Sequence, residues 1–243
     1  MNKRKNQIDI TAKDILRFVE FNTGNKKAFN VYTKKYYEIT KMSKSQLIMN
    51  VAVIIQFFTG LRINEVAKLS FSQLQGLSKN NTIFVILSKN KRTKKREIVI
   101  SGKSSDGKKL KKVLMTLLKD WFGLKQDFLV VSKNMVSTAI TVKGKNGIVY
   151  HSSVFEYIKT FTRKINKKLK DFVEYSKSIK ITVLSKSVEK FTTHILRNNY
   201  IVKLYEILKY DLSAVSFEIG HSSINITNIY ISRYMKTQKV AVF

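Results

Sequence analysis

The chain has 243 residues, no cysteine and a formal net charge of +30 at pH 7. Hydrophobic residues make up 44% of it, which indicates a folded protein with a sizeable core rather than a disordered chain. The absence of cysteine excludes disulfides and thiolate metal sites, and it favours a reducing compartment. The longest apolar stretch, Val51–Phe58, is too short for a membrane span, which needs about 20 apolar residues.

The net charge favours a polyanionic partner. Self-repulsion of this size destabilises a compact state unless a polyanion neutralises it. We expect a nucleic acid, with a membrane surface as the second candidate and a merely solubilising charge as the third. The basic residues are mostly lysine and the chain has no proline, a bias that an AT-rich genome also explains. The number of lysines alone therefore carries little weight.

The first elements are predicted from the spacing of apolar residues. A short amphipathic helix is expected over Ala12–Phe21, and a strong helix over Ser43–Phe58, with Gly60 as its stop signal. A second short helix is expected over Arg62–Leu69. Next, Thr82–Leu87 and Glu97–Ser101 have the composition of strands. They flank a polar and basic turn, so this unit is predicted to be a β-hairpin with a charged tip.

The rest of the chain is predicted to be mostly helical, without a linker or an internal repeat. One segment, Phe128–Tyr150, is ambiguous and reads as a short strand followed by a polar loop. The predicted fold class is α+β, mostly helical, with one small antiparallel β-hairpin. The helices expected after the hairpin are Leu110–Trp121, Val154–Phe172, Thr193–Leu208, Ser213–Ile219 and Ile226–Tyr230.

A series of reactive side chains near the carboxyl end suggests phosphodiester chemistry. A tyrosine hydroxyl can attack a phosphodiester if fixed cations hold the phosphate and neighbouring groups handle the protons. Arginine suits the first task, because its planar fork stays protonated and grips two phosphate oxygens. Arg62 and Arg197 are the candidates. Glu65 is expected either to orient Arg62 or to cap its helix.

The proton-handling candidates are two histidines and one tyrosine. His194 and Arg197 are three residues apart and share one face of the predicted helix. His221 follows Gly220, whose conformational freedom lets the imidazole face a ligand. Tyr230 is the candidate nucleophile, although most tyrosines serve packing and Tyr234 is its nearest competitor. Since a free phenol has a pKa of about 10, nearby cations must stabilise the phenolate.

The leaving 5′ oxygen needs a proton, and a lysine at the hairpin supplies one. Lys89 is the first choice and Lys91 the alternative; both stay open, because the turn also reads as a cluster of phosphate contacts. A metal-dependent nuclease is disfavoured, since the acidic residues are scattered, and no cofactor is expected. The predicted DNA contacts are Lys91, Arg92, Lys94, Lys95 and Arg96.

These residues resemble a known family, the tyrosine recombinases, also called phage-integrase-type site-specific recombinases. Residues 59–69 (TGLRINEVAKL) are similar to the first arginine box, 193–197 (THILR) to the second box, and 212–230 to the final box. The resemblance implies a tyrosine recombinase-like catalytic domain that cleaves and rejoins DNA through a 3′-phosphotyrosyl intermediate. It implies that Tyr230 is the nucleophile and places the hairpin lysine at Lys89. The phosphate contacts and their supporting acid would be Arg62, Glu65, His194, Arg197 and His221.

The resemblance also sets expectations for domains, partners and location. Residues 1–40 would be a short segment in which the family's core-binding domain is reduced or absent, and residues 41–243 the catalytic domain, with a lysine-rich insertion within 103–190. The expected partner is double-stranded DNA, bound by a homo-tetramer or with an accessory DNA-binding protein, and no membrane. The expected location is the cytoplasm, at the nucleoid, or an organelle, without secretion.

Two other functions fit the same residues. One is a type IB topoisomerase-like enzyme that relaxes DNA with the same chemistry, and the other a non-catalytic architectural DNA-binding protein. The sequence predicts neither the target site nor the role within a mobile genetic element, as integrase, resolvase or transposon enzyme.

Overall fold

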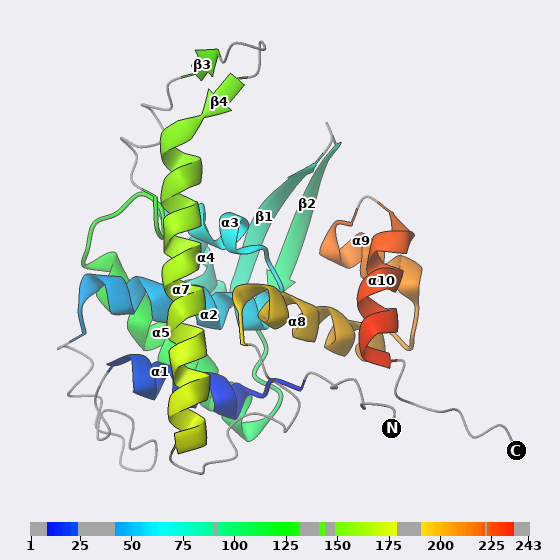
Figure 1. Cartoon of the computed structure of the whole chain (residues 1–243), viewed down its shortest axis with the longest axis horizontal. Coiled ribbons are helices and arrows are strands. Elements are labelled where there is room, and N and C mark those ends of the chain that lie inside the picture. The colour runs from blue at the N-terminus through cyan, green and yellow to red at the C-terminus, as the bar shows by residue number, and fades with distance from the viewer. Residues whose placement is uncertain are drawn as a thin grey trace, which may run out of the picture.

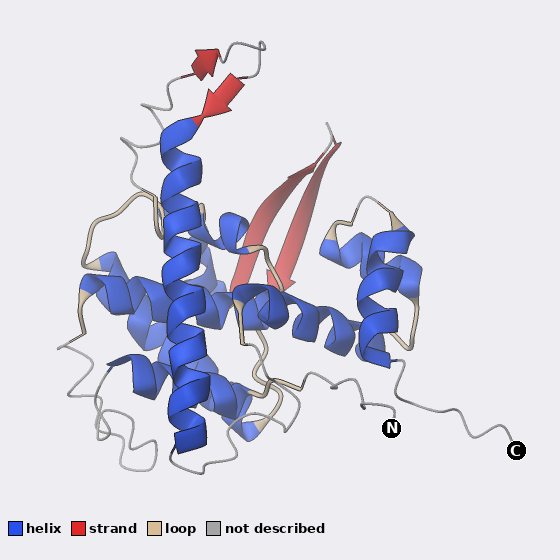
Figure 2. Cartoon of the chain, viewed as in Figure 1, coloured by secondary structure: helices blue, strands red, loops and turns tan. Residues whose placement is uncertain are grey.

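The computed structural model describes residues 9–23, 42–89, 92–131, 141–143, 149–178, 191–221 and 223–235. Within these ranges it leaves the side chains of residues 86–89, 92–95, 141–143, 149–153 and 233–235 undescribed. The described part is mostly helical, with two small antiparallel sheets (Figures 1 and 2). The predicted α+β, mostly helical class is confirmed.

A buried helix, α2 (Lys44–Thr59), lies at the centre of the larger hydrophobic core. Residues 51–55 are all fully buried, so the helix is surrounded by protein rather than half exposed. It packs against α1 (Ala12–Thr23), α5 (Ser105–Phe122) and α8 (Thr193–Ile207). Ser43 caps its start and accepts a hydrogen bond from the Gln46 N–H, while the Gln46 side chain accepts one from the Ser43 N–H.

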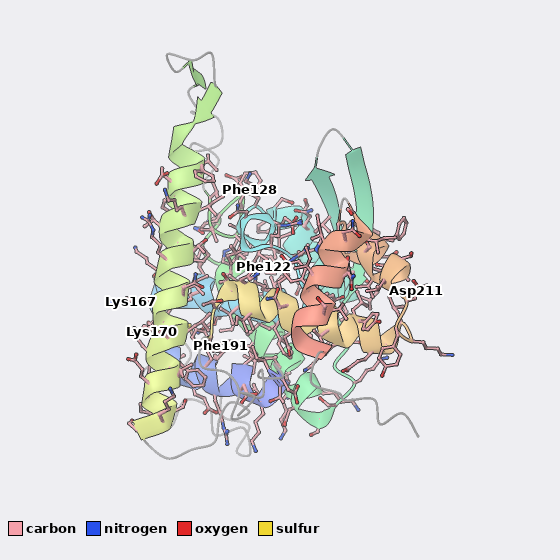
Figure 3. All side chains as sticks on the ribbon, turned by 45° about the vertical axis from the view of Figure 1, so that its right-hand side comes forward. Phe122, Phe128, Lys167, Lys170, Phe191 and Asp211 are labelled. Atoms are coloured by element: carbon pink, nitrogen blue, oxygen red, sulfur yellow. The ribbon has the colours of Figure 1, made fainter. Side chains whose placement is uncertain are left out.

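The longest helix, α7 (Ser152–Ser178), runs along one side of this core (Figure 1). Its inner face includes Ile165, Leu169 and Phe172, and its outer face is rich in lysine. The Phe172 ring lies 5.8 Å from Phe18 in α1 and 6.3 Å from Phe191, measured between ring centroids. Figure 3 shows Phe191 beside the part of α7 that carries Lys167 and Lys170. The aromatic contacts thus join the amino-terminal helix to the start of α8.

The predicted β-hairpin is present, and its strands are longer than expected. β1 (Thr82–Lys89) pairs with β2 (Arg92–Val99) in a register that matches Thr82 with Val99 and Lys89 with Arg92. The described basic residues that were assigned to a loop therefore continue the strands: Lys89 in β1, and Arg92, Lys94, Lys95 and Arg96 in β2. The hairpin projects from the helical body (Figure 1). It follows α4 (Phe71–Asn80), a helix that the sequence did not predict and that buries Leu74 and Leu77.

The carboxyl-terminal helices form a second, smaller core. α8 crosses from the main body to α9 (Leu212–Ile219) and α10 (Ile224–Met235), which pack against its far half (Figure 1). The buried residues there are Ile201, Val202, Val215, Ile219 and Ile231. Asp211 caps α9 by accepting a hydrogen bond from the Ala214 N–H at 2.9 Å. All three helices were predicted, although α10 begins before Ile226 and ends beyond Tyr230.

The remaining elements are two short strands and a short helix. β3 (Thr141–Lys143) and β4 (Val149–His151) form a second antiparallel pair within the segment that the sequence left ambiguous. α3 (Ile63–Ala67) follows the turn that ends α2. Among the described residues, no helix is long and apolar enough to cross a membrane.

Candidate active site

The hydrogen-bonded turn after α2 forms one side of the site. Gly60 ends the helix in the left-handed region, at φ 63°, where its N–H donates to the Gln56 carbonyl. The Thr59 hydroxyl donates to the Ile55 carbonyl at 2.7 Å and accepts from the Leu61 N–H at 3.2 Å. These bonds fix the direction in which the Gly60 carbonyl and the following residue point.

Arg62 starts α3 and is held by Glu65. Its backbone N–H donates to Glu65 Oε2 at 2.6 Å, and its Nη1 lies 3.0 Å from Glu65 Oε1. Glu65 therefore does both of the things expected of it, since it caps the helix and orients the arginine. The Arg62 side chain stays 36% exposed, so much of its guanidinium is open to a ligand.

Arg197 lies deep between three segments of the chain and is only 4% exposed. Its Nη1 donates to the Gly60 carbonyl, and its Nη2 donates to the Ile219 carbonyl at 3.4 Å. Burial, and then the charge of Arg62, lowers the pKa of Arg197 to about 10. The side chain is still a cation at neutral pH, and it ties the turn after α2 to the end of α9.

His221 is fixed from both sides of its ring. Gly220 ends α9 in the left-handed region, at φ 71°, and brings His221 back toward α8. The His221 Nε2 lies 3.3 Å from Arg197 Nη2, and its Nδ1 lies 2.8 Å from the hydroxyl of Thr227, which is fully buried. Because a guanidinium only donates, a bond to Nε2 requires the proton on Nδ1, which then donates to Thr227.

Tyr230 projects from α10 toward the two histidines. Its ring stacks on that of His221, with centroids 5.5 Å apart and an interplanar angle of 21°. The His194 ring lies 5.7 Å from it at 54°. The Tyr230 phenol also interacts electrostatically with Arg197. Helices α8, α9 and α10 therefore meet at one place, with two imidazoles and a guanidinium around one phenol.

The hairpin residues are described less fully. Lys89 ends β1, but its side chain and those of Arg92, Lys94 and Lys95 lie outside the described part, as does the whole of Lys91. The choice between Lys89 and Lys91 as the proton donor stays open. Arg96 is different, because only 3% of its side chain is exposed. The surface contact with DNA predicted for Arg96 does not fit this buried position.

Sequence reasoning missed three contributors to the site. They are the buried hydroxyl of Thr227 and the backbone carbonyls of Gly60 and Ile219. The burial of Arg96 did have a signal in the sequence, since it alternates with Ile98 in β2 and with Ile100 just after the strand, both buried. No comparable signal reveals which carbonyl groups meet an arginine. Among the described residues, no group of histidine and acidic side chains could hold a metal ion.

Comparison with known proteins identifies the family of this chain. Residues 30–237 match the model of the phage integrase family. The chain belongs to this family. The match covers the two arginines, both histidines and Tyr230, so the resemblance to tyrosine recombinases drawn from the sequence is confirmed.

Two solved structures of XerH support the fold. A XerH site-specific recombinase bound to its difH substrate before cleavage matches with a TM-score of 0.52 and 16% identity, over 93% of this chain and 50% of that one. XerH bound to a palindromic difH substrate after cleavage gives 0.52 and 17%, over 97% and 52%. The Tn1549 transposon integrase with transposon right-end DNA gives 0.47 and 18%, over 95% and 62%. The chain thus spans about half of the XerH chains. No curated protein sequence matches it.

Proposed function

We propose that the chain cleaves and rejoins double-stranded DNA at specific sites, with Tyr230 as the nucleophile. The observation that carries the proposal is the position of the Tyr230 phenol beside His221 and His194, in the field of a buried Arg197. An imidazole beside the phenol accepts its proton as the oxygen attacks, and a nearby cation stabilises the negative charge that develops in the transition state. The family and its DNA-bound members support DNA as the partner.

The reaction consists of two successive transesterifications at one phosphorus. The Tyr230 oxygen attacks the phosphorus, its proton passes to an imidazole, and the bond from phosphorus to the 5′ oxygen breaks. That oxygen takes a proton from the hairpin lysine, Lys89 or Lys91. In the second step a 5′ hydroxyl attacks the phosphorus and gives its proton to the same lysine. The bond from phosphorus to Tyr230 breaks, and the phenol takes its proton back from the imidazole. Arg62 and Arg197 hold the non-bridging oxygens, whose charge grows in each transition state.

The cleavage step is tested by trapping. A pool of randomised duplexes with a nick near the centre loses a short fragment on cleavage, so the protein remains covalently attached to the DNA. We expect adducts with the wild-type protein and none with Tyr230→Phe, which should still bind DNA. Tyr234→Phe is the matched control and should form adducts. Adducts that persist in Tyr230→Phe would show that another residue is the nucleophile, and sequencing of trapped DNA would reveal the preferred site.

The proposal also includes the assembly in which strands are exchanged. Strand exchange would take place in a homo-tetramer on DNA, with an accessory DNA-binding protein where one is required, and at the nucleoid or the DNA of an organelle. Incubation with supercoiled plasmid separates this proposal from relaxation by single copies of the chain. Joined products from two DNA molecules support recombination, and relaxed circles alone support a topoisomerase-like activity.

A further inference from the structure

Arg96 is a buried cation in the second strand of the hairpin, and its charge acts on Arg197. Its side chain is 3% exposed, and neither its Nε nor its Nη1 has a hydrogen-bond partner among the described residues. A buried charge with few partners costs stability, because it has lost the hydration that it would have in water. A residue of this kind in a folded protein calls for an explanation beyond packing.

Two side chains from different helices face this guanidinium. The Nη2 of Arg96 donates to the Tyr200 hydroxyl at 3.1 Å, and its Cζ lies 5.7 Å from the centre of the Tyr200 ring. Its Nε lies 3.9 Å from Oε2 of Glu218. Arg96 therefore links β2 to α8 through Tyr200 and to α9 through Glu218. Tyr200 packs on Gly60, and Glu218 directly precedes Ile219. The carbonyls of Gly60 and Ile219 both accept hydrogen bonds from Arg197.

Tyr200 braces the turn after α2. It lies three residues after Arg197 in α8, so both side chains project from the same side of the helix. Its ring is packed so tightly on Gly60 that a Cβ added there would lie 2.3 Å from Tyr200 Cδ1. The carbonyl of this glycine accepts a hydrogen bond from Arg197. A shift of the Tyr200 ring would therefore remove its packing against Gly60 and allow the Gly60 carbonyl to move away from Arg197.

Glu218 lies beside the second carbonyl that accepts a hydrogen bond from Arg197. It directly precedes Ile219, whose carbonyl accepts from Arg197 Nη2 at 3.4 Å. Two residues after Glu218, Gly220 turns the chain so that His221 meets both Arg197 and Tyr230. The end of α9 thus carries one of Arg197's two carbonyl partners and the histidine that stacks on the phenol.

We propose that Arg96 is a positioning residue, which holds Tyr200 and Glu218 so that Arg197 and His221 keep their places around Tyr230. The inference rests on the proposed function, and it assigns Arg96 no contact with DNA. Its effect is on geometry, and a displacement of about 1 Å at a reacting centre can reduce a rate about 100-fold. It also makes the hairpin, which carries the proposed proton donor, part of the same rigid unit as the two arginines.

The test measures three quantities on the full chain. They are the rate of adduct formation at saturating nicked DNA, the affinity for the same DNA, and the imidazole resonances in a proton–carbon NMR spectrum. The chain has only three histidines, so His221→Asn identifies the signal of His221. The variants are Arg96→Met, Arg96→Lys, Tyr200→Phe and Glu218→Gln. Lys79→Met removes one exposed cation at the end of α4 and serves as the control.

We expect Arg96→Met to lower the adduct rate about 100-fold, in line with a displaced reacting centre. DNA affinity should stay near that of the wild-type protein, and the His221 resonance should move. Arg96→Lys should restore the rate only in part, because one ammonium does not reproduce the fork that spans Tyr200 and Glu218. Tyr200→Phe removes a single hydroxyl and decides the matter if Arg96→Met does not fold. Lys79→Met should leave all three quantities unchanged.

Two results would overturn the inference. The first is an unchanged rate and an unchanged His221 resonance in both Arg96→Met and Tyr200→Phe. The second is a loss of DNA affinity in Arg96→Met at an unchanged saturated rate, which would make Arg96 a DNA contact. If the wild-type protein forms no adduct, the proposed function fails. The His221 resonance then decides by itself whether Arg96 positions the site.

Discussion

Arg197 is a cation that the fold has largely removed from water. Two backbone carbonyls accept its hydrogen bonds, but no carboxylate bonds to it among the described residues, and Arg62 adds a second positive charge nearby. Burial, which is the larger effect, and the charge of Arg62 together lower the pKa of Arg197 to about 10. A bound phosphate would act in the opposite direction. Since no described carboxylate bonds to Arg197, a bound phosphate would supply its anionic partner.

This electrostatic arrangement predicts that inorganic phosphate stabilises the protein. An anion that binds only the folded state adds about 2.7 kcal/mol to the free energy of unfolding at about 100 times its Kd. We expect phosphate to raise the Tm of the wild-type protein, measured by thermal unfolding at constant ionic strength with chloride as the reference salt. Arg62→Gln should reduce this rise, because it removes the more exposed of the two guanidinium groups. A rise of equal size in Arg62→Gln would mean that phosphate acts elsewhere.

At the scale of single residues, the sequence was informative where chemistry and spacing coincide. The sequence singled out His194, Arg197, His221 and Tyr230 because few residue types perform this chemistry and because helical spacing brings the first two onto one face. The structure brings these side chains together, and their catalytic roles stay predictions. Arg96, which was predicted to contact DNA, is buried in the structure. It was grouped with the basic residues before it, although its alternation with Ile98 and Ile100 points it inward.

The turn between α2 and α3 shows how one element boundary positions the site. Gly60 combines a positive φ, the contact with Tyr200 and the carbonyl that Arg197 binds. A side chain at this position meets two separate obstacles, since the left-handed backbone disfavours a Cβ and the Tyr200 ring occupies its space.

We therefore expect Gly60→Ala to destabilise the protein and to slow adduct formation. Overpacking a tight contact costs about 1–3 kcal/mol, and the left-handed backbone adds about 1 kcal/mol. Urea unfolding measures the loss of stability. Gly76→Ala is the matched control, because Gly76 lies inside α4 and a Cβ there would meet only the Thr82 carbonyl, at 3.5 Å. It should be neutral or stabilising by up to about 1 kcal/mol. Equal effects of the two substitutions would refute the special role of Gly60.

At the scale of elements, periodicity predicted most of the long helices, and it failed where the pattern is weak. α4 was missed because it buries only Leu74 and Leu77 and contains Gly76. The hairpin strands extend into residues whose charge suggested a turn, because strand pairing depends on backbone bonds rather than on side-chain polarity. α5 begins at Ser105 rather than Leu110, with Ser104 as its cap.

The described part of the molecule has a large core around α2 and a small one between α8, α9 and α10. Arg62 belongs to the first region and Tyr230 to the second, and Arg197 in α8 bridges them. No local sequence pattern could predict this division, because it depends on contacts between helices far apart in the chain. The projecting hairpin adds a third part, and its basic residues contribute to the charge of +30.

The hairpin's share of DNA binding is measurable from the dependence on salt. Each phosphate that the protein neutralises contributes about 0.9 to the slope of log affinity against log salt. We expect the quadruple change of Lys91, Arg92, Lys94 and Lys95 to Gln to lower this slope by about 0.9 for each phosphate that the variant no longer neutralises. Fluorescence anisotropy of a labelled duplex over a range of NaCl concentrations measures it. The control removes the same charge from exposed residues in and beside α5: Lys103, Lys108, Lys119 and Lys125. It should weaken binding slightly and leave the slope nearly unchanged, because only the total charge of the protein differs. If both quadruple variants lower the slope equally, the DNA follows the general charge of the molecule, and the hairpin has no special part in holding it.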